Sequence, residues 1–73
     1  MGMNHEKNEL GIVKIFNSFK GFGFITREKG KDAFFFYEDI VKDLTQVFPG
    51  DRVSFIVRQT SKGPRAYSIK KLS

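Results

Sequence analysis

The chain has 73 residues, which is enough for one small domain and too few for two. Thirteen lysines and arginines against eight acidic residues leave a net charge of +5, which suits a polyanionic partner. The lack of cysteine excludes disulfides and thiolate metal sites, and no apolar run approaches the ~20 residues of a membrane-spanning helix. We therefore expect a cytoplasmic monomer held by apolar packing, with no membrane segment, metal or cofactor.

Residues 1–9 are polar and show no hydrophobic periodicity, which predicts a flexible N-terminal tail before one folded domain over residues 10–73. The single histidine, His5, lies in this tail. The predicted domain therefore has neither cysteine nor histidine, and it has no phosphate-cradling glycine loop. These missing parts predict that the chain is not an enzyme.

A first strand is predicted over residues 10–17 because apolar side chains alternate there. In a regular strand Lys14 and Phe16 would share one face, and Val13 and Ile15 the other. A bulge in this strand would change the phase midway. The sequence therefore leaves open whether Ile15 or Phe16 faces outward.

Two aromatic runs follow, at residues 20–25 and 33–37. The segment Glu28-Lys29-Gly30 between them predicts a three-residue hairpin loop, with Gly30 in the left-handed conformation. The two runs are thus expected to pair as antiparallel strands.

The register of this hairpin follows from its loop. Two pairs of rings then share one face: Phe24 opposite Phe34, and Phe22 opposite Phe36. On the other face Phe35 lies opposite Gly23, so that a large ring covers a residue without a side chain. The hairpin is thus predicted to carry a patch of four rings.

This patch has two interpretations. Most phenylalanines are core residues, but nine Phe and two Tyr are many for so short a chain, and some are expected to meet water. Lys14, Lys20 and Arg27 are interleaved with the rings. Bases stack on rings while cations meet phosphates, so the combination favours binding of single-stranded nucleic acid.

The second half of the chain begins with a change of period. Residues 38–47 place apolar side chains on one helical face, which predicts a short helix or helical turn. Phe48-Pro49-Gly50-Asp51 has proline and glycine at the centre of a type II turn. The rest of the chain is predicted as strands.

The next strand, residues 52–58, alternates Val53, Phe55 and Val57 toward the core. Residues 61–64 form a turn into a last strand over residues 65–72. The predicted order is strand, strand, strand, helical turn, strand, strand, which is an all-β chain.

The aromatic runs also resemble a known family. Residues 11–25, GIVKIFNSFKGFGFI, look like the opening of a bacterial cold-shock protein, with ribonucleoprotein motifs at residues 20–25 and 33–37 and a later Gly63-Pro64 turn. The resemblance implies a five-stranded antiparallel Greek-key barrel of the oligonucleotide-binding type. It also implies a role in preventing RNA self-structure or in tuning transcription or translation, with single-stranded RNA or DNA as the partner.

The residues and the resemblance together give a candidate site. The nucleic-acid-binding residues are expected to be Lys14, Ile15, Phe16, Lys20, Phe22, Phe24, Phe34, Phe36, Tyr37, Lys62 and Arg65. Three of them depart from the family pattern: Ile15 replaces a tryptophan, Phe36 a histidine and Tyr37 a phenylalanine. The inventory of stacking side chains is therefore altered.

Two other classes of protein compete with this interpretation. A four-stranded ribonucleoprotein fold would need a helix before its motif, whereas only nineteen residues precede Lys20 and none is predicted helical. A protein-interaction barrel would use the aromatic face to grip a peptide or another subunit. The sequence leaves this second alternative open.

Overall fold

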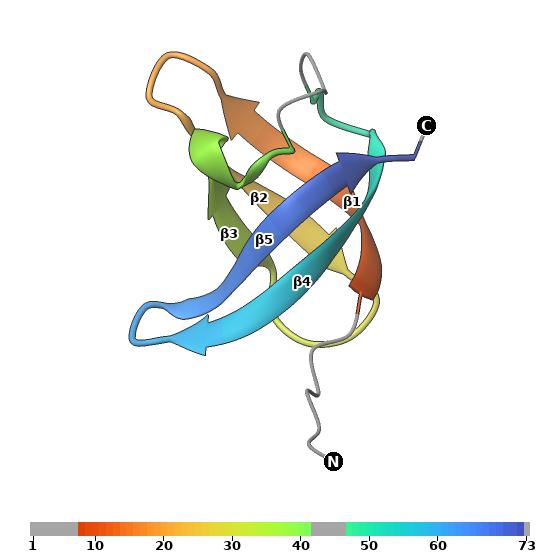
Figure 1. The fold of residues 1–73 in the computed structure, drawn as a ribbon, viewed down its shortest axis with the longest axis vertical. Coiled ribbons are helices and arrows are strands. Elements are labelled where there is room, and N and C mark those ends of the chain that lie inside the picture. Colours follow the sequence, from red (N-terminus) through yellow and green to blue (C-terminus); the bar gives the residue numbers. More distant parts are fainter. Residues whose placement is uncertain (1–7, 42–46, 73) are drawn as a thin grey trace.

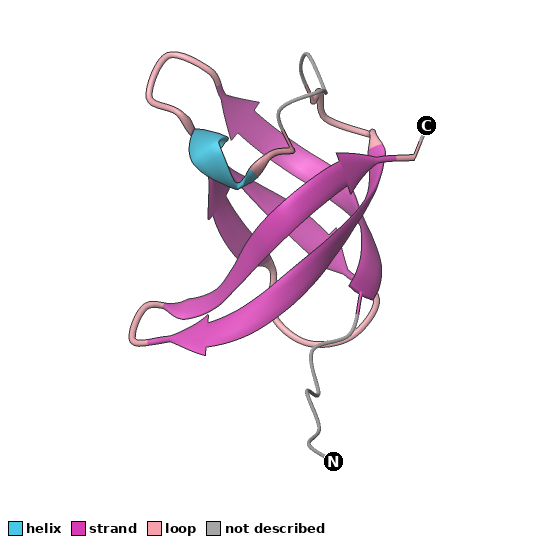
Figure 2. Cartoon of the chain, viewed as in Figure 1, coloured by secondary structure: helices cyan, strands magenta, loops and turns pink. Residues whose placement is uncertain are grey.

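The computed structural model describes residues 8–41 and 47–72. Five strands and one short 3-10 turn follow one another along the chain (Figures 1 and 2). Their bounds are β1 (Asn8–Asn17), β2 (Phe22–Arg27), β3 (Ala33–Phe36), η1 (Tyr37–Asp39), β4 (Arg52–Thr60) and β5 (Gly63–Lys71). The predicted order of elements is confirmed.

The strands close into a barrel in the order β1-β2-β3-β5-β4. Closure occurs because β1 pairs with β2 along one side and with β4 along the other. Neighbouring strands are antiparallel except at the seam between β3 and β5, where the pairing is parallel. At this seam β3 and β5 run in the same direction (Figure 1).

β1 can pair with both β2 and β4 because it bends at a bulge. Its register against β2 shifts between Val13, which lies opposite Ile25, and Ile15, which lies opposite Phe24. The turn before β4 fixes this point, since the Gly50 amide donates to the Val13 carbonyl at 2.8 Å. The bulge considered from the sequence is therefore present.

The core of the described residues lies inside the barrel. Its fully or nearly buried apolar residues are Val13, Ile25, Ala33, Phe35, Val47, Val53, Phe55, Ala66 and Ile69. The ring of Phe35 lies over Gly23, where an added Cβ would come within 2.7 Å of it. This contact, and the inward direction of Val53 and Phe55, confirm the predicted faces of the strands.

The pairing of β2 with β3 confirms the predicted register of the aromatic hairpin. The predicted three-residue loop was too short, however, because the ladder ends at the pair Ile25 and Ala33. The Arg27 side chain pairs with Glu9 on β1, with nitrogen–oxygen distances of 3.0 and 3.1 Å, and its Nη1 donates to the Lys31 carbonyl at 3.3 Å. Gly30 has the expected positive φ, at 87°.

The other connections were predicted in part. The Asp51 amide donates to the Phe48 carbonyl at 3.0 Å and Gly50 has φ 94°, as a type II turn requires. Within the described part of the helix predicted over residues 38–47, η1 is the helical segment; Ile40 is extended and bridges to β5. Residues 42–46 of that prediction, and residues 1–7 of the predicted tail, lie outside the described residues.

Candidate nucleic-acid interface

The registers of the five strands define one continuous row on the outside of the barrel. Partners in adjacent strands point to the same face of a sheet. Following the pairs from β1 to β4 gives the row Ile15, Phe24, Phe34, Arg65 and Arg58. A second row lies two residues away along the strands and contains Asn17, Phe22 and Phe36. On β5, Tyr67 follows Arg65 on the same face.

Four phenylalanines of these rows form the patch predicted from the sequence; we call it the aromatic face. Phe22 and Phe24 meet edge to face with ring centroids 6.1 Å apart, and Phe34 and Phe36 do so at 5.6 Å. Edge-to-face contact holds neighbouring rings in fixed orientations. All four are partly exposed, so the aromatic face is open to solvent and is not part of the core.

The bulge in β1 decides between Ile15 and Phe16. Ile15 lies opposite Phe24 on the aromatic face and is 49 % exposed. Phe16 lies opposite Gly23 and stacks on the buried Phe35, with ring centroids 5.6 Å apart. Of the two alternatives that the sequence leaves open, the structure therefore has Ile15 on the aromatic face, and Phe16 turns toward the interior.

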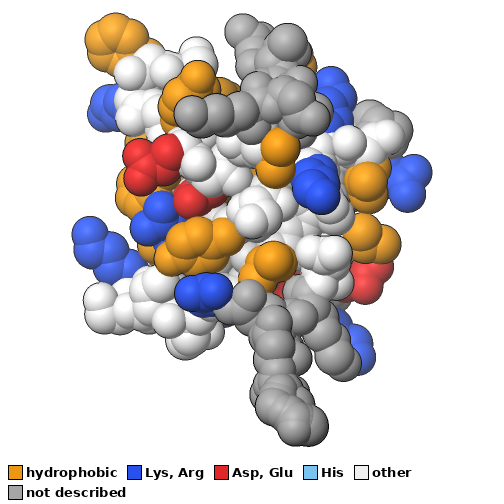
Figure 3. Space-filling model, viewed as in Figure 1, with side chains coloured by type: hydrophobic (Ala, Val, Ile, Leu, Met, Phe, Trp, Pro, Cys, Tyr) orange, Lys and Arg blue, Asp and Glu red, His pale blue; other side chains and the backbone are white. Residues whose placement is uncertain are grey.

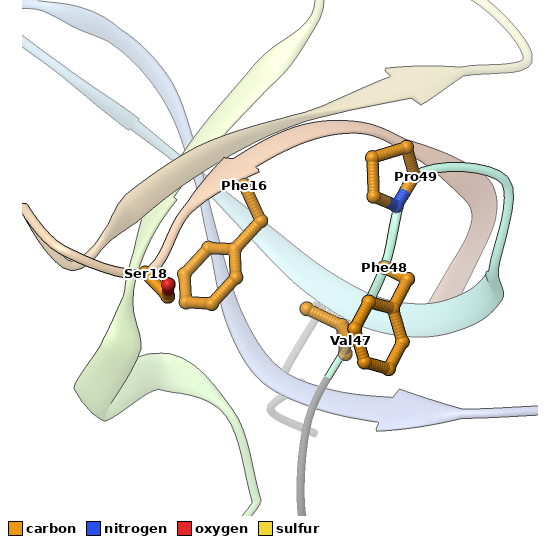
Figure 4. A pocket seen from close by; sticks show the side chains of 5 residues that line it. All are labelled: Phe16, Ser18, Val47, Phe48 and Pro49. Carbon is orange, nitrogen blue, oxygen red and sulfur yellow. The ribbon is translucent and has the colours of Figure 1, made fainter.

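Phe16 instead lines a pocket at the end of the barrel (Figure 4). Its ring lies beside Ser18, and Val47, Phe48 and Pro49 line the pocket on the other side (Figure 4). Lys71 lies near this pocket, with its ammonium nitrogen 5.8 Å from the Phe48 ring centroid. The pocket is thus separate from the outward rows.

The predicted lysines lie at three places around the aromatic face. Lys14 is at the bulge and pairs with Asp32 at 2.9 Å, with more than half of its side chain exposed. Lys20 is exposed in the turn between β1 and β2, where its amide donates to Asn17 Oδ1 at 3.0 Å. Lys62 is exposed at the tip of the β4–β5 hairpin. Figure 3 shows basic and hydrophobic side chains interleaved on the side of the molecule where β3 and β5 lie.

Arg65 is held more firmly than the sequence suggests. Its Nε and Nη2 each donate to the Asp39 carboxylate at 3.0 Å, and Asp39 is only 7 % exposed. The guanidinium carbon lies 4.6 Å from the Phe36 ring centroid and 4.7 Å from that of Tyr67. The bond to Asp39 also raises the pKa of Arg65 above its ordinary value.

This arrangement gives Arg65 a role besides the phosphate contact predicted for it. The bidentate pair with Asp39 occupies the Nε–Nη2 edge of the guanidinium. The rings of Phe36 and Tyr67 lie close to the same group. Arg65 therefore supports the ring of Phe36 from its own place in the outward row.

Three further rings, Phe19, Tyr37 and Tyr67, lie outside the four rings of the aromatic face and are exposed or partly exposed. Tyr37 was predicted and is 68 % exposed; its amide donates to the Gly21 carbonyl at 2.8 Å, which fixes it at the end of the hairpin. Phe19 and Tyr67 were not predicted. Tyr67 could have been found because it stands two residues after Arg65 on an alternating strand, whereas Phe19 lies in a turn, where no periodicity operates.

Two kinds of feature are absent from the described residues. Among residues 8–41 and 47–72, no group of three or more His, Cys, Asp or Glu side chains is placed to hold a metal ion. Within the same ranges no helix is long and apolar enough to cross a membrane.

A closed five-stranded barrel with this strand order and an outward aromatic face defines the oligonucleotide-binding class of β-barrel. Residues 9–72 match the family described as the 'Cold-shock' DNA-binding domain. The chain therefore belongs to the cold-shock domain family, which binds nucleic acid and is not a family of enzymes. The resemblance noted in the sequence and the prediction of a non-enzymatic chain are confirmed.

Relatives with known names support this assignment. The chain is 44 % identical over 64 residues to the cold shock protein CspC of Bacillus subtilis, which covers 86 % of this chain and 97 % of that protein. It is also 44 % identical to the cold shock-like protein CspA of Vibrio cholerae, over 85 % of this chain and 91 % of the relative. A solved structure of Drosophila Unr CSD456 superposes with a TM-score of 0.78 at 28 % identity, over 93 % of this chain; the match spans only 28 % of that longer chain.

Proposed function

We propose that this protein binds single-stranded RNA or DNA by stacking unpaired bases on its aromatic face. The observation that carries the proposal is the pair of edge-to-face ring contacts, Phe22 with Phe24 and Phe34 with Phe36, on adjacent strands with partial exposure. Rings held in this way offer preformed surfaces for bases, and base–aromatic stacking contributes about 1–3 kcal/mol per base.

The proposal extends to the residues around the four rings. Ile15 borders the face beside Phe24, and Tyr37 lies at its end beside Gly21. Lys14, Lys20 and Lys62 would contact phosphates, and the net charge of +5 supports a polyanionic ligand. Phe16 and Arg65 act on the site indirectly, by supporting Phe35 and Phe36.

Single strands are favoured over duplexes for a geometric reason. In a duplex each base is already stacked and paired, so its flat side cannot reach a protein ring unless the base is unstacked at a cost. The face itself is a convex strand surface without a projecting helix to enter a groove. We infer a role in which the protein keeps RNA unpaired, as a chaperone or a regulator of transcription or translation.

Two further features belong to the same proposal. One domain, formed around residues 10–73, acts as a monomer, because the aromatic face is a surface for a ligand and not for a second copy. The lack of cysteine suits a reducing cytoplasm, where we expect the protein to act. The oligomeric state is checked by analytical ultracentrifugation with and without oligonucleotide.

The central experiment is a titration with labelled oligonucleotides followed by fluorescence anisotropy. A single strand should bind, and a hairpin stem of the same length should compete poorly. With about three phosphate contacts, log K should fall with log salt with a slope of about −2. Equal affinity for stem and single strand, or an affinity that does not change with salt concentration, would contradict the proposal.

Paired variants separate the aromatic face from the core. Phe22→Ala should weaken binding by about 1–3 kcal/mol with a modest loss of stability. The matched control, Phe55→Ala, removes a fully buried ring and should cost roughly 3–5 kcal/mol of folding. If Phe22→Ala unfolds the domain while folded molecules keep their affinity, the four rings serve only packing.

A further inference from the structure

Phe19 is the most exposed of the large hydrophobic residues in the described part of the chain, at 95 %. It lies in the turn between β1 and β2, outside both strands. Its ring therefore contributes almost nothing to packing.

The turn that carries Phe19 has a fixed shape. The Gly21 amide donates to the Asn17 carbonyl at 2.7 Å, and the Lys20 amide donates to the Asn17 side chain at 3.0 Å. Gly21 closes the turn with φ 77°, a conformation that favours glycine. Phe19 is thus presented on a hydrogen-bonded turn.

This turn is continuous with the aromatic face. Asn17 and Phe22, the residues that flank it, are cross-strand partners at the end of the second outward row. Chain geometry keeps the Cα of Phe19 within about 10 Å of that of Phe22, because the two residues are only three positions apart. On the other side, the Gly21 carbonyl accepts from the amide of Tyr37, whose ring is 68 % exposed. Figure 1 shows the β1–β2 turn beside η1 at this end of the barrel.

Charge completes the arrangement. Lys20 follows Phe19 directly and is exposed in the same turn. A ring and an ammonium group on adjacent residues can meet a base and a phosphate of one nucleotide. The net charge of +5 makes a second copy of this chain a less favourable partner for the lysine than a phosphate.

We propose that Phe19 is an additional base-stacking position, which extends the ligand by about one nucleotide beyond Phe22 at the Tyr37 end of the aromatic face. The inference rests on the proposed function, since it concerns the same single strand. It predicts a longer binding site than the strands alone provide. It also assigns a role to a ring that the fold leaves unused.

The test measures affinity against ligand length, with homothymidine oligonucleotides of about 3 to about 10 nucleotides. Phe22→Ala should weaken binding at every length. Phe19→Ala should leave the shortest ligands unaffected and weaken the longer ones by about 5- to 30-fold. Leu72→Ala is the matched control, because it trims an exposed apolar side chain, 51 % exposed, directly after the end of β5.

A second variant gives a signal at the position itself. The chain has no tryptophan, so Phe19→Trp introduces a single indole. It should keep the affinity for long ligands, and long ligands should quench its emission while the shortest should not. Folding is not at risk in either variant, because the side chain is exposed.

The outcomes are distinct. If the wild-type protein binds no oligonucleotide, the proposed function fails. If the wild-type protein binds and Phe19→Ala has the same affinity as the wild type at every oligonucleotide length, this inference fails while the proposed function stands. If Phe19→Ala abolishes a concentration-dependent self-association and leaves oligonucleotide binding unchanged, Phe19 is a contact between copies, which also overturns the inference.

Discussion

Asp39 and Arg65, which are 26 residues apart in the chain, form a bidentate pair across the seam between η1 and β5. Asp39 Oδ2 also accepts the amide of Phe36 at 2.9 Å, so one carboxylate orients both the arginine and the backbone beneath a ring of the aromatic face. Because Arg65 is in turn packed against Phe36, the pair fixes that ring from two directions.

The first prediction concerns this pair. Asp39→Asn removes the charge of the bidentate acceptor and leaves the more distant Glu38, at 3.9 Å, as an acidic partner of Arg65. The free energy of unfolding should fall by about 1–3 kcal/mol. Arg65→Lys should also destabilise, because an ammonium group cannot make the bidentate contact or stack flat between two rings. Urea unfolding of both single variants and the double variant gives their coupling energy. Additive effects would show that the two side chains do not act together.

The second prediction uses the neighbours Ile15 and Phe16. Ile15→Trp places a ring opposite Phe24 on an open surface, so affinity for single strands should rise by about 1 kcal/mol and ligand should quench the new fluorescence. Phe16→Trp is the control; it overpacks the contact with Phe35 and should cost about 1–3 kcal/mol of stability. If the fluorescence of the indole at position 15 does not change when ligand is added, the ligand does not contact β1.

The third prediction concerns Ser68, which has φ 53° where the register of β5 against β4 shifts. This left-handed conformation is unfavourable for residues with a Cβ. Ser68→Gly should therefore stabilise the fold by up to about 1 kcal/mol, after allowing for the entropy that glycine loses. Ser54→Gly on the partner strand should destabilise, since Ser54 does not share this conformation. Thermal or urea unfolding decides whether the two changes have opposite signs.

The fourth prediction concerns pH. The Phe48 amide donates to the Asp51 carboxylate at 2.8 Å and, with the nearby Lys71 ammonium group, lowers the pKa of Asp51 below 3.8. A folded-state pKa below the unfolded value contributes stability that is present above pH 3.8 and is lost as the pH falls through the folded value. Asp51→Asn should thus be less stable than the wild type at neutral pH.

The same variant should approach the wild type in stability as the medium is acidified below pH 3.8. Glu28→Gln, in the exposed β2–β3 loop, controls for the loss of one negative charge. A destabilisation of Asp51→Asn that stays constant down to acid pH would mean that the carboxylate charge contributes nothing to the turn.

Local pattern was enough to predict the aromatic hairpin. Alternation placed four rings on one face, and the pairing of Gly23 with Phe35 left only one register that fits both faces. The type II turn at Pro49 and Gly50 was predictable for the same reason, because two residues with special backbone preferences stand side by side.

The features that sequence missed depend on distant partners. Whether Ile15 or Phe16 faces outward is set by a bulge that Gly50 fixes through Val13, and no local pattern contains that contact. The partner of Arg65 was not predicted either. Its acceptor, Asp39, lies in a 3-10 turn on the other side of the seam.

The parallel seam between β3 and β5 has a dynamic consequence. Its ladder consists of one registered pair, Phe34 with Arg65, extended by the bridge from Ile40 to Ile69. A junction with so few backbone bonds is where the barrel should open first, and amide exchange there should be the fastest within the sheet. A bound single-stranded nucleic acid that contacts both Phe34 and β5 would hold the two sides of this seam together. The ligand should then slow amide exchange far more at the seam than in β4.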